Sequence, residues 1–420
     1  LLIEGARRVG KSTIVEQFAK AEYKSYILID FNNTTVQIKQ LFEDLTNMNI
    51  FFLLLQQQSG VKLYDRESVI IFDEVQRFPL ARQAIKYLVK DGRYDYIETG
   101  SLISIKKSTK DITIPSEETR ITMHPLDYEE FLWALGDETT TELLPQFYHK
   151  GLPLKQAHRK TMRNFRLYML VGGMPQAVNA YLDTNNFSDV DQIKREIIKL
   201  YLDDFRKIDS TGSLERLFVN IPAQLSNNVS RYMPYQAVGD VKGNKIQELL
   251  NDLEDSKTTL MCYRSNDPNV GMSLTQDRTR YKIYLADTGL FVTLCFWDKD
   301  ITDNTIYTNL LFDKLQVNLG YVYENAVAQM LVANGNKLFY YTFPTNDGKR
   351  LYEVDFLLSH GSKIWPIEVK SSGYTTHNSL DEFCKKFSSR IDKRFLIGIK
   401  DFSRQQATTI LPIYMTHLLR

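Results

Sequence analysis

Short apolar runs of four to six residues alternate with helical patterns along the first 125 residues. The runs are rich in β-branched and aromatic residues, while the stretches between them have the apolar spacing of amphipathic helices. The predicted strands are Leu1–Glu4, Tyr26–Phe31, Ser68–Asp73, Tyr94–Thr99 and Arg120–His124, and the predicted helices include Lys11–Ala21, Thr35–Leu45 and Leu80–Lys90. This alternation predicts an α/β domain with a mostly parallel sheet and helices on both faces.

Helical patterns continue from residue 126 to about 206, interrupted at Gly172-Gly173-Met174-Pro175. Residues 207–300 then predict three helices followed by two strands, near Thr258–Arg264 and Tyr281–Leu285, which is the element order of a winged helix-turn-helix.

A polar passage, Asp298–Asn309, precedes a last α/β region. This region is predicted to contain a helix near Tyr321–Ala333, the strands Lys337–Phe343, Arg350–Leu358 and Lys363–Lys370, and then a further helix and more strand. We therefore expect four regions, at residues 1–125, 126–206, 207–300 and 310–420.

Composition narrows the class of protein. The chain of 420 residues is too long for one ordinary domain, and its 52 basic and 51 acidic side chains nearly cancel. Its three cysteines are isolated from one another, which predicts a reducing, cytoplasmic environment. The densest apolar run, Ile50–Leu55, is far shorter than the roughly 20 residues that cross a bilayer, so no membrane partner is expected. Because the chain begins at Leu1 rather than Met, we expect a trimmed natural N-terminus.

A glycine-rich loop follows the first predicted strand and precedes the first predicted helix. It fits the pattern G-x-x-x-x-G-K-[ST] of a P-loop, in which backbone N–H groups and a helix N-terminus hold phosphate oxygens. Its lysine reaches the β- and γ-phosphates of ATP, and its serine hydroxyl is a ligand for Mg²⁺. The loop comprises Gly5, Ala6, Arg7, Arg8, Val9, Gly10, Lys11 and Ser12, with Thr13 following.

An acidic pair ends the buried strand Ser68–Asp73. Asp73 is predicted to hold Mg²⁺, and Glu74 to orient or deprotonate the attacking water. In P-loop ATPases with such a glutamate, the following strand places a polar side chain beside the γ-phosphate. Thr99 and Ser101 are both candidates for that position, since they end the strand Tyr94–Thr99 and its Thr-Gly-Ser turn.

Several motifs in order resemble a family of prokaryotic AAA-type ATPases that is related to signal-transducing (STAND) and origin-recognition-like NTPases. They are Gly5–Ser12, Phe72–Gln76, Ile97–Ser101, His124–Leu132, Gly172–Val178, Lys282–Leu290, Glu353–Asp355 and Pro366–Ser371. The resemblance covers the whole chain. It implies a P-loop NTPase sheet, a helical lid over residues 126–206, a winged helix, and a C-terminal domain of unknown function similar to restriction-endonuclease-like nucleases.

The resemblance also implies two further nucleotide-binding residues. Pro175 is similar to the lid proline that packs on adenine in STAND proteins, although a loop that simply separates two helices explains it equally well. Arg120 is a candidate charge sensor for the γ-phosphate, in competition with Arg7 and Arg8.

The predicted recognition helix of the winged helix, near Asn244–Glu254, has an unexpected charge. Within Asp240–Lys257 five acidic residues face three lysines, whereas a helix that binds DNA phosphates normally carries the opposite balance. We therefore expect this region to pack on the ATPase or on a protein partner rather than on DNA.

A second chemical signal lies near the C-terminus. Glu324 falls in a predicted helix, Asp355 in one predicted strand, and Glu368 with Lys370 in the next. If these strands pair as a hairpin, Asp355 and Glu368 can share a Mg²⁺ ion, and Lys370 can position hydroxide or stabilise the pentavalent phosphorus. This is the E…D…ExK arrangement of restriction-endonuclease-like enzymes. The alternative is an exposed hairpin with alternating charges.

Local charge adds to this picture. Residues 360–420 contain ten basic and five acidic residues, a net charge of +5 against +1 for the whole chain. Such a module suits nucleic acid or an acidic protein surface. The sequence therefore predicts a Mg²⁺-dependent ATPase switch that controls a nuclease-like domain, with DNA as a candidate partner. The alternative is an ATP-gated regulator whose C-terminal domain only docks.

Overall fold

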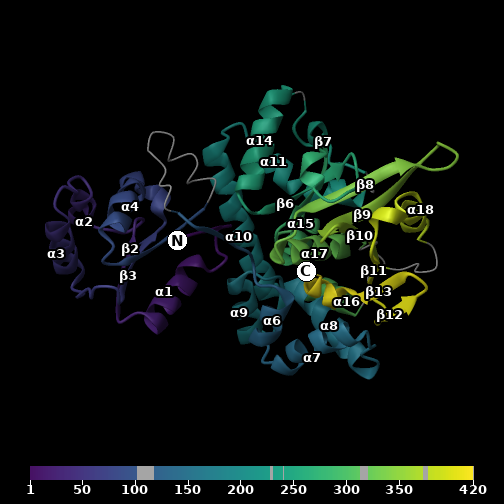
Figure 1. Cartoon of the computed structure of the whole chain (residues 1–420), viewed down its shortest axis with the longest axis horizontal. Coiled ribbons are helices and arrows are strands. Elements are labelled where there is room, and N and C mark those ends of the chain that lie inside the picture. Colours follow the sequence, from purple (N-terminus) through teal and green to yellow (C-terminus); the bar gives the residue numbers. More distant parts are fainter. Residues whose placement is uncertain (102–117, 228–229, 240, 313–319, 372–376, 420) are drawn as a thin grey trace. The chain divides into compact units, whose positions relative to one another are not determined.

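The structure is a computed structural model, and it describes residues 1–101, 118–227, 230–239, 241–312, 320–371 and 377–419 (Figure 1). The chain forms two compact units. The first comprises Leu1–His124 together with the short segment Asp255–Lys257, and the second comprises the rest of the chain from Pro125 onward. Within the described residues, no helix is both long and apolar enough to cross a membrane.

The first unit is built on a five-stranded parallel sheet. Its strands are β1 (Leu2–Gly5), β2 (Ser25–Asp30), β3 (Ser68–Asp73), β4 (Asp95–Gly100) and β5 (Arg120–Met123), in the order β2-β3-β4-β1-β5. All five lie where the sequence predicts them. β3 is buried along its whole length, as expected of a strand covered by helices on both faces.

Helices cover the two faces of this sheet. α1 (Lys11–Glu22) packs on Val69 and Ile71 of β3. The opposite face of the strand, with Ile70 and Phe72, packs on α3 (Met48–Ser59) and α4 (Pro79–Asp91). This division follows from the period of two along a strand. A shorter helix, α2 (Val36–Leu41), completes that layer.

α3 was not among the predicted helices, because its apolar run Ile50–Leu55 has no polar interruption that would reveal a period. In the structure, the helical period is visible in which of these apolar side chains are buried and which are exposed. Phe51, Phe52 and Leu55 are buried, whereas Leu53 is 65% exposed.

The second unit begins with the predicted helical region. Its helices are α6 (Tyr128–Ala134), α7 (Glu138–Lys150), α8 (Gln156–Val171), α9 (Pro175–Thr184) and α10 (Phe187–Ile208). Four further helices follow, one more than predicted: α11 (Ser213–Val219), α12 (Ile221–Ser226), α13 (Pro234–Val238) and α14 (Gly243–Asp255).

An eight-stranded mixed sheet forms the other part of the second unit, in the order β12-β13-β11-β10-β9-β8-β6-β7. Its strands are β6 (Thr259–Ser265), β7 (Gln276–Leu285), β8 (Leu338–Pro344), β9 (Leu351–His360), β10 (Lys363–Lys370), β11 (Arg394–Gly398), β12 (Ser403–Gln405) and β13 (Thr408–Pro412). β6 pairs with β8 in parallel. The two strands expected to form a wing therefore belong to the same sheet as the strands of the C-terminal region. The helices α17 (Gly320–Ala333) and α18 (Asn378–Lys386) accompany the sheet.

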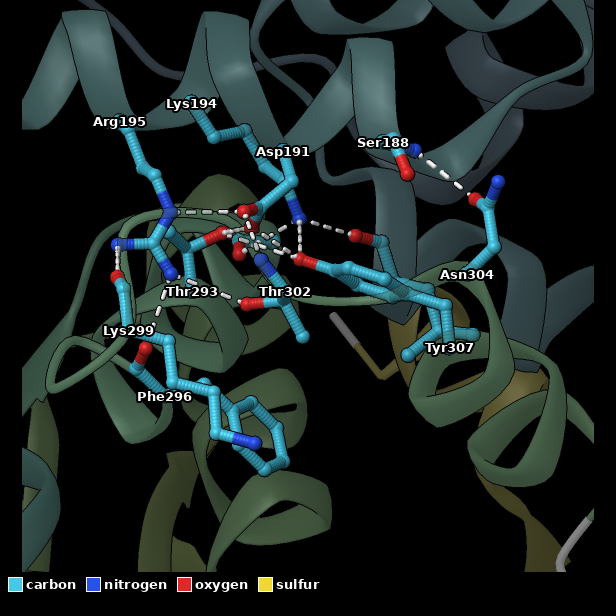
Figure 2. A network of polar contacts seen from close by, with 12 residues as sticks. Ser188, Asp191, Lys194, Arg195, Thr293, Phe296, Lys299, Thr302, Asn304 and Tyr307 are labelled. Carbon is cyan, nitrogen blue, oxygen red and sulfur yellow. Dashed lines mark hydrogen bonds and ion pairs between the residues drawn. The ribbon is translucent and has the colours of Figure 1, made fainter.

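A buried polar network joins α10 to α15 (Thr288–Cys295) and α16 (Asn304–Leu311), as Figure 2 shows. Asp191 accepts hydrogen bonds from the Tyr307 hydroxyl at 2.6 Å and from the Thr302 N–H at 2.9 Å. Arg195 donates to Asp191 and to the carbonyl oxygens of Phe296 and Lys299. The polar passage Asp298–Asn309 is thus fixed to α10 rather than left as a free connection.

The Gly-Gly-Met-Pro segment lies against a second sequence motif, the Asp287-Thr288-Gly289 turn. Asp287 accepts a hydrogen bond from the Gly173 N–H at 2.6 Å and from the Leu290 N–H at 2.8 Å. A Cβ atom on Gly289 would lie 2.5 Å from the Gly172 Cα atom. Glycine is therefore required here because two backbones touch.

Candidate functional site

The loop from Gly5 to Ser12 connects β1 to α1, as predicted. Gly10 forms the N-cap of α1 with a φ of 98°, a conformation that glycine adopts without strain. A Cβ atom on Gly5 would lie 2.4 Å from the Met123 carbonyl oxygen, so the loop starts where β1 and β5 are closest. Ala6 and Val9 are buried, Arg7 is half-buried and Arg8 is exposed. The loop is therefore anchored by its apolar residues.

Lys11 begins α1 and turns back into the loop. Its ammonium group donates to the Ala6 carbonyl at 2.9 Å and to the Gly5 carbonyl at 3.2 Å. Burial lowers the pKa of Lys11, while the nearby carboxylates of Glu74 and Asp73 act in the opposite direction. A cation held in a curled loop at a helix N-terminus is an arrangement that binds phosphate.

Asp73 is the centre of the polar groups at the carboxyl ends of β3 and β4. Its carboxylate accepts a hydrogen bond from the Ser12 hydroxyl at 2.8 Å and another from the Thr99 hydroxyl. Thr99 in turn accepts from the Glu74 N–H at 3.3 Å. Asp73 therefore brings together the hydroxyl groups of Ser12, from the loop, and Thr99, from the end of β4. Hard oxygen donors of this kind suit Mg²⁺.

Glu74 follows β3 with a φ of 55°, in the left-handed region that is uncommon for a residue with a side chain. Its carboxylate accepts a hydrogen bond from the Gln76 amide at 2.5 Å. Gln76 was not singled out from the sequence, although it stands in the motif Phe72–Gln76. The conformation of Glu74 is sparsely populated and is of the type found at functional sites.

The remaining nucleotide-site predictions fall in different places. Thr13 is exposed in the first turn of α1, and Ser101 is half-buried directly after β4. Arg120 pairs with Leu2 at the amino end of β1, whereas the phosphate loop follows the carboxyl end of that strand. The guanidinium group of Arg120 contacts Glu118. The structure therefore does not favour Arg120 as a charge sensor. Pro175 begins α9 in the second unit. Its role at an adenine ring stays a prediction.

The second predicted cluster lies on the eight-stranded sheet. β9 and β10 form the expected antiparallel hairpin, with Phe356 opposite Ile367. Asp355 and Glu368 are the next residues of these strands, and Asp355 accepts a hydrogen bond from the Val369 N–H at 2.8 Å. The carboxylate of Glu368 contacts the Lys370 ammonium group at 2.7 Å. The hairpin therefore brings the three residues together.

The charges in this cluster influence one another. Burial first, and then repulsion from Glu324, raises the pKa of Asp355 well above its ordinary value. Burial opposes ionisation of Lys370, but the Glu368 carboxylate outweighs it and raises the pKa of the lysine. Glu368 is 5% exposed, and its Oε2 atom has no hydrogen-bond partner. An acidic oxygen buried in this way is a candidate ligand for a cation.

Glu324 approaches from α17, as predicted, but its partner was missed. The ammonium group of Lys282, on β7, lies 2.8 Å from Glu324 Oε1 and 2.6 Å from Glu353 Oε1. The Tyr284 hydroxyl also donates to Glu324. The sequence signal was the alternation Lys282-Ile283-Tyr284, which places both polar groups on one face of a strand. Among the described residues, no group of three or more acidic, histidine or cysteine side chains is arranged to hold a metal ion.

Comparison with known families divides the chain into three matched parts. Residues 1–132 match a family model described as an AAA domain. Residues 162–301 match a domain of unknown function (DUF8612), and residues 319–416 match another (DUF4143). Together with its parallel sheet and loop, the first match shows that the N-terminal unit is a P-loop domain of AAA type. No curated protein matches the chain.

Three solved structures show distant similarity to the chain. The ORC1 protein of Aeropyrum pernix in complex with DNA is 10% identical, with a TM-score of 0.27 over 74% of this chain and 86% of that one. Cdc6p from Pyrobaculum aerophilum is 12% identical, with a TM-score of 0.24 over 75% and 88%. Protein VC1899 from Vibrio cholerae is 11% identical, with a TM-score of 0.18 over 94% and 95%.

Proposed function

We propose that the first unit binds ATP with Mg²⁺ and hydrolyses it. One observation carries this proposal: Asp73 accepts the Ser12 hydroxyl at 2.8 Å directly beside the loop that encloses Lys11. A P-loop lysine, the following hydroxyl and an acidic strand end are the groups that hold the phosphates and the metal of a nucleotide.

Each group has a defined role in this proposal. Lys11 exchanges its two carbonyl partners for the β- and γ-phosphate oxygens, and the loop N–H groups hold the same phosphates. Ser12 and Asp73 would hold Mg²⁺, which supplies positive charge that offsets the phosphate charge. Glu74 orients and deprotonates the attacking water, and Thr99 lies where a polar side chain can contact the γ-phosphate.

Two variants test these roles. Lys11→Ala should lose ATP binding in calorimetry, because no other described side chain places an ammonium group inside the loop. Glu74→Gln should retain binding and lose phosphate release, because the metal ligands remain while the base does not. Lys24→Ala is the matched control, since Lys24 forms an exposed ion pair with Glu67 in the same unit. Turnover at the wild-type rate in either active-site variant would contradict the assignment.

A second function is proposed for the cluster on β9 and β10, namely Mg²⁺-dependent cleavage of nucleic acid. The observation that favours it is the buried, unpartnered Oε2 atom of Glu368 beside Asp355 and Lys370. Asp355 and Glu368 would hold the ion, which supplies Lewis acidity at a phosphodiester. Lys370 would position hydroxide or stabilise the pentavalent phosphorus.

The test is a panel of linear, branched and single-stranded DNA and RNA with Mn²⁺, with and without ATP. Asp355→Ala and Glu368→Ala should each abolish cleavage and leave ATP hydrolysis near normal, because the two sites use separate ions. Lys370→Ala should keep the ion and lose the chemistry. If wild-type protein cuts none of these substrates and carboxylate variants bind Mn²⁺ as the wild type does, the C-terminal region is a docking module.

The nucleotide state of the first unit would control these activities. The exposed face of α14 carries both Glu248 and Lys245, so it lacks the uniform positive charge of a DNA-reading helix. We therefore assign α14 to a protein contact, and place DNA at the basic C-terminal region. Identical protease digestion patterns with ATP, with ADP and without nucleotide would contradict such a switch.

A further inference from the structure

The ammonium group of Lys282 occupies an unusual position in the second unit. It is a long side chain on β7 that is only 5% exposed, and it crosses the face of the sheet to reach α17 and β9. Its nitrogen lies within 2.8 Å of carboxylate oxygens from both Glu324 and Glu353, and 5.6 Å from the ring centroid of Tyr340. Two carboxylates from different elements therefore converge on a single point.

Such convergence is costly without a cation. Glu324 and Glu353 are 18% and 26% exposed, and one oxygen of each contacts the lysine nitrogen. Removing carboxylates from water is unfavourable unless a positive charge compensates, so a cation at this point stabilises both ionised groups. Either an ammonium group or a divalent metal can supply it, since oxygen ligands suit both.

The whole cluster has an excess of negative charge, which favours binding of a cation. Four carboxylates gather here, and two ammonium groups offset half of their charge. The acidic members are Glu324, Glu353, Asp355 and Glu368, and the basic ones are Lys282 and Lys370. Glu368 Oε2 is buried without a hydrogen-bond partner, so part of the uncompensated acidic charge lies on the Asp355–Glu368 side. On the other side, Lys282 offsets one of the two carboxylate charges of Glu324 and Glu353.

We propose that Lys282 occupies a divalent-cation position formed by Glu324 and Glu353. The lysine keeps metal out of that half of the cluster, so any ion that the wild-type protein takes binds at Asp355 and Glu368 alone. The side chain is thus a positioning residue that limits the cluster to one ion. This inference stands apart from nucleic-acid cleavage, because it concerns which cation Glu324 and Glu353 accept and not what the ion does.

The test counts Mn²⁺ bound to the full-length, nucleotide-free protein by electron paramagnetic resonance of the free ion. Lys282→Met has a side chain of similar length without charge, and it should bind one more equivalent of Mn²⁺ than the wild type. Because the result is a difference, ions bound at the phosphate loop or at Asp355 and Glu368 cancel. Equal stoichiometry in the variant and the wild type would overturn the proposal.

Two matched variants test whether the extra ion binds between Glu324 and Glu353, or elsewhere on the protein because a positive charge has been lost. Lys282→Arg keeps a fixed cation at the point and should gain no ion. The double variant Lys282→Met/Glu353→Gln removes one ligand and should also gain none. An extra ion in either would mean that the additional site lies elsewhere, and the proposal would fail.

The charge left unpaired in Lys282→Met can prevent folding in the absence of metal. Thermal unfolding with added Mn²⁺ keeps the proposal testable in that case. Mn²⁺ should restore a cooperative transition in Lys282→Met that the same ionic strength of NaCl does not restore. A variant that stays unfolded at millimolar Mn²⁺ would overturn the proposal.

The outcome also distinguishes this inference from the second proposed function. If the wild type binds no ion on the sheet and Lys282→Met binds one, the result supports a cation position that Lys282 occupies in the wild type. Metal-dependent cleavage is then contradicted. If the wild type binds one ion that Glu368→Gln loses, and Lys282→Met binds two, both are supported.

Discussion

Glu98 is a buried acid beside the nucleotide site whose charge the fold does not fully compensate. It precedes Thr99 on β4 and is 2% exposed. The Nη1 atom of Arg82 lies 3.8 Å from the Glu98 carboxylate, but Arg82 makes a closer contact, at 2.6 Å, with Glu118. Burial is the main cause that raises the pKa of Glu98 to about 7, and Arg82 opposes that rise.

This raised pKa gives the stability of the first unit a defined pH dependence. An acid whose pKa is higher in the folded state binds more protons when folded, so its contribution is present below about pH 4.5 and is lost as pH rises to about 7. Glu98→Gln cannot titrate. Relative to the wild type, its free energy of unfolding should increase by about 2–3 kcal/mol between pH 5 and pH 8.

Urea unfolding of both proteins at several pH values measures this difference. Glu67→Gln is the control, because Glu67 forms an exposed ion pair and should change the slope little. Parallel pH profiles for Glu98→Gln and the wild type would show that Glu98 is ionised in the folded protein throughout this range.

At the scale of elements, α10 is held in the second unit by charged groups rather than by apolar packing alone. Lys194 is fully buried and donates to the Tyr307 hydroxyl at 3.0 Å (Figure 2). It also donates to the Leu170 carbonyl at 2.7 Å. Burial is the main cause that lowers the pKa of Lys194 to about 8, while Asp191 opposes that change. The carboxylate of Asp191 therefore compensates two buried cations, Lys194 and Arg195.

Asp191→Ala should destabilise the second unit by about 3–5 kcal/mol, because it leaves Lys194 and Arg195 buried without their counter-ion. Asp203→Ala, at an exposed position of the same helix, should change the free energy of unfolding by less than about 0.5 kcal/mol. Chemical unfolding followed by circular dichroism measures both. A loss below 1 kcal/mol in Asp191→Ala would mean that the network adds little to stability.

The contact between the two glycine motifs provides a second test at this scale. Gly289→Ala places a methyl group 2.5 Å from the Gly172 Cα atom, so the backbones must separate, at a cost of about 3 kcal/mol. Gly243→Ala is the matched control, because its nearest neighbour would be 4.0 Å away and alanine favours the helix. Thermal unfolding should show a lower midpoint for Gly289→Ala and an unchanged or higher one for Gly243→Ala.

Elements with a local signal could be predicted from the sequence, and those defined by distant pairing could not. β3 and the Gly5–Ser12 loop are specified by apolar runs and glycines within a few residues, and both were predicted. α3 was missed because six consecutive apolar residues suit a strand and a helix equally. The contact between Lys282 and Glu353 depends on the strand order β9-β8-β6-β7, which no local pattern specifies.

At the scale of the whole molecule, each unit has its own sheet and its own buried core. The first unit takes in Asp255–Lys257, and Lys257 lies 3.7 Å from Glu4 on β1, directly before the phosphate loop. The chain therefore passes from the first unit to the second after His124, returns to the first unit at Asp255–Lys257, and then continues in the second. Separate cores predict separate unfolding steps, since a two-state transition is a property of single domains.

The last prediction follows from this division. Calorimetry should show two transitions, and Mg²⁺ with a non-hydrolysable ATP analogue should shift only the one that belongs to the first unit. A ligand at about 100 times its Kd stabilises the folded state by about 2.7 kcal/mol, which raises the midpoint of a domain of this size by roughly 10 °C. Lys11→Ala should abolish that shift, and Asp191→Ala should lower only the other transition, which assigns each step to its unit. A single transition, or a nucleotide shift shared equally by both, would mean that the units unfold as one cooperative body.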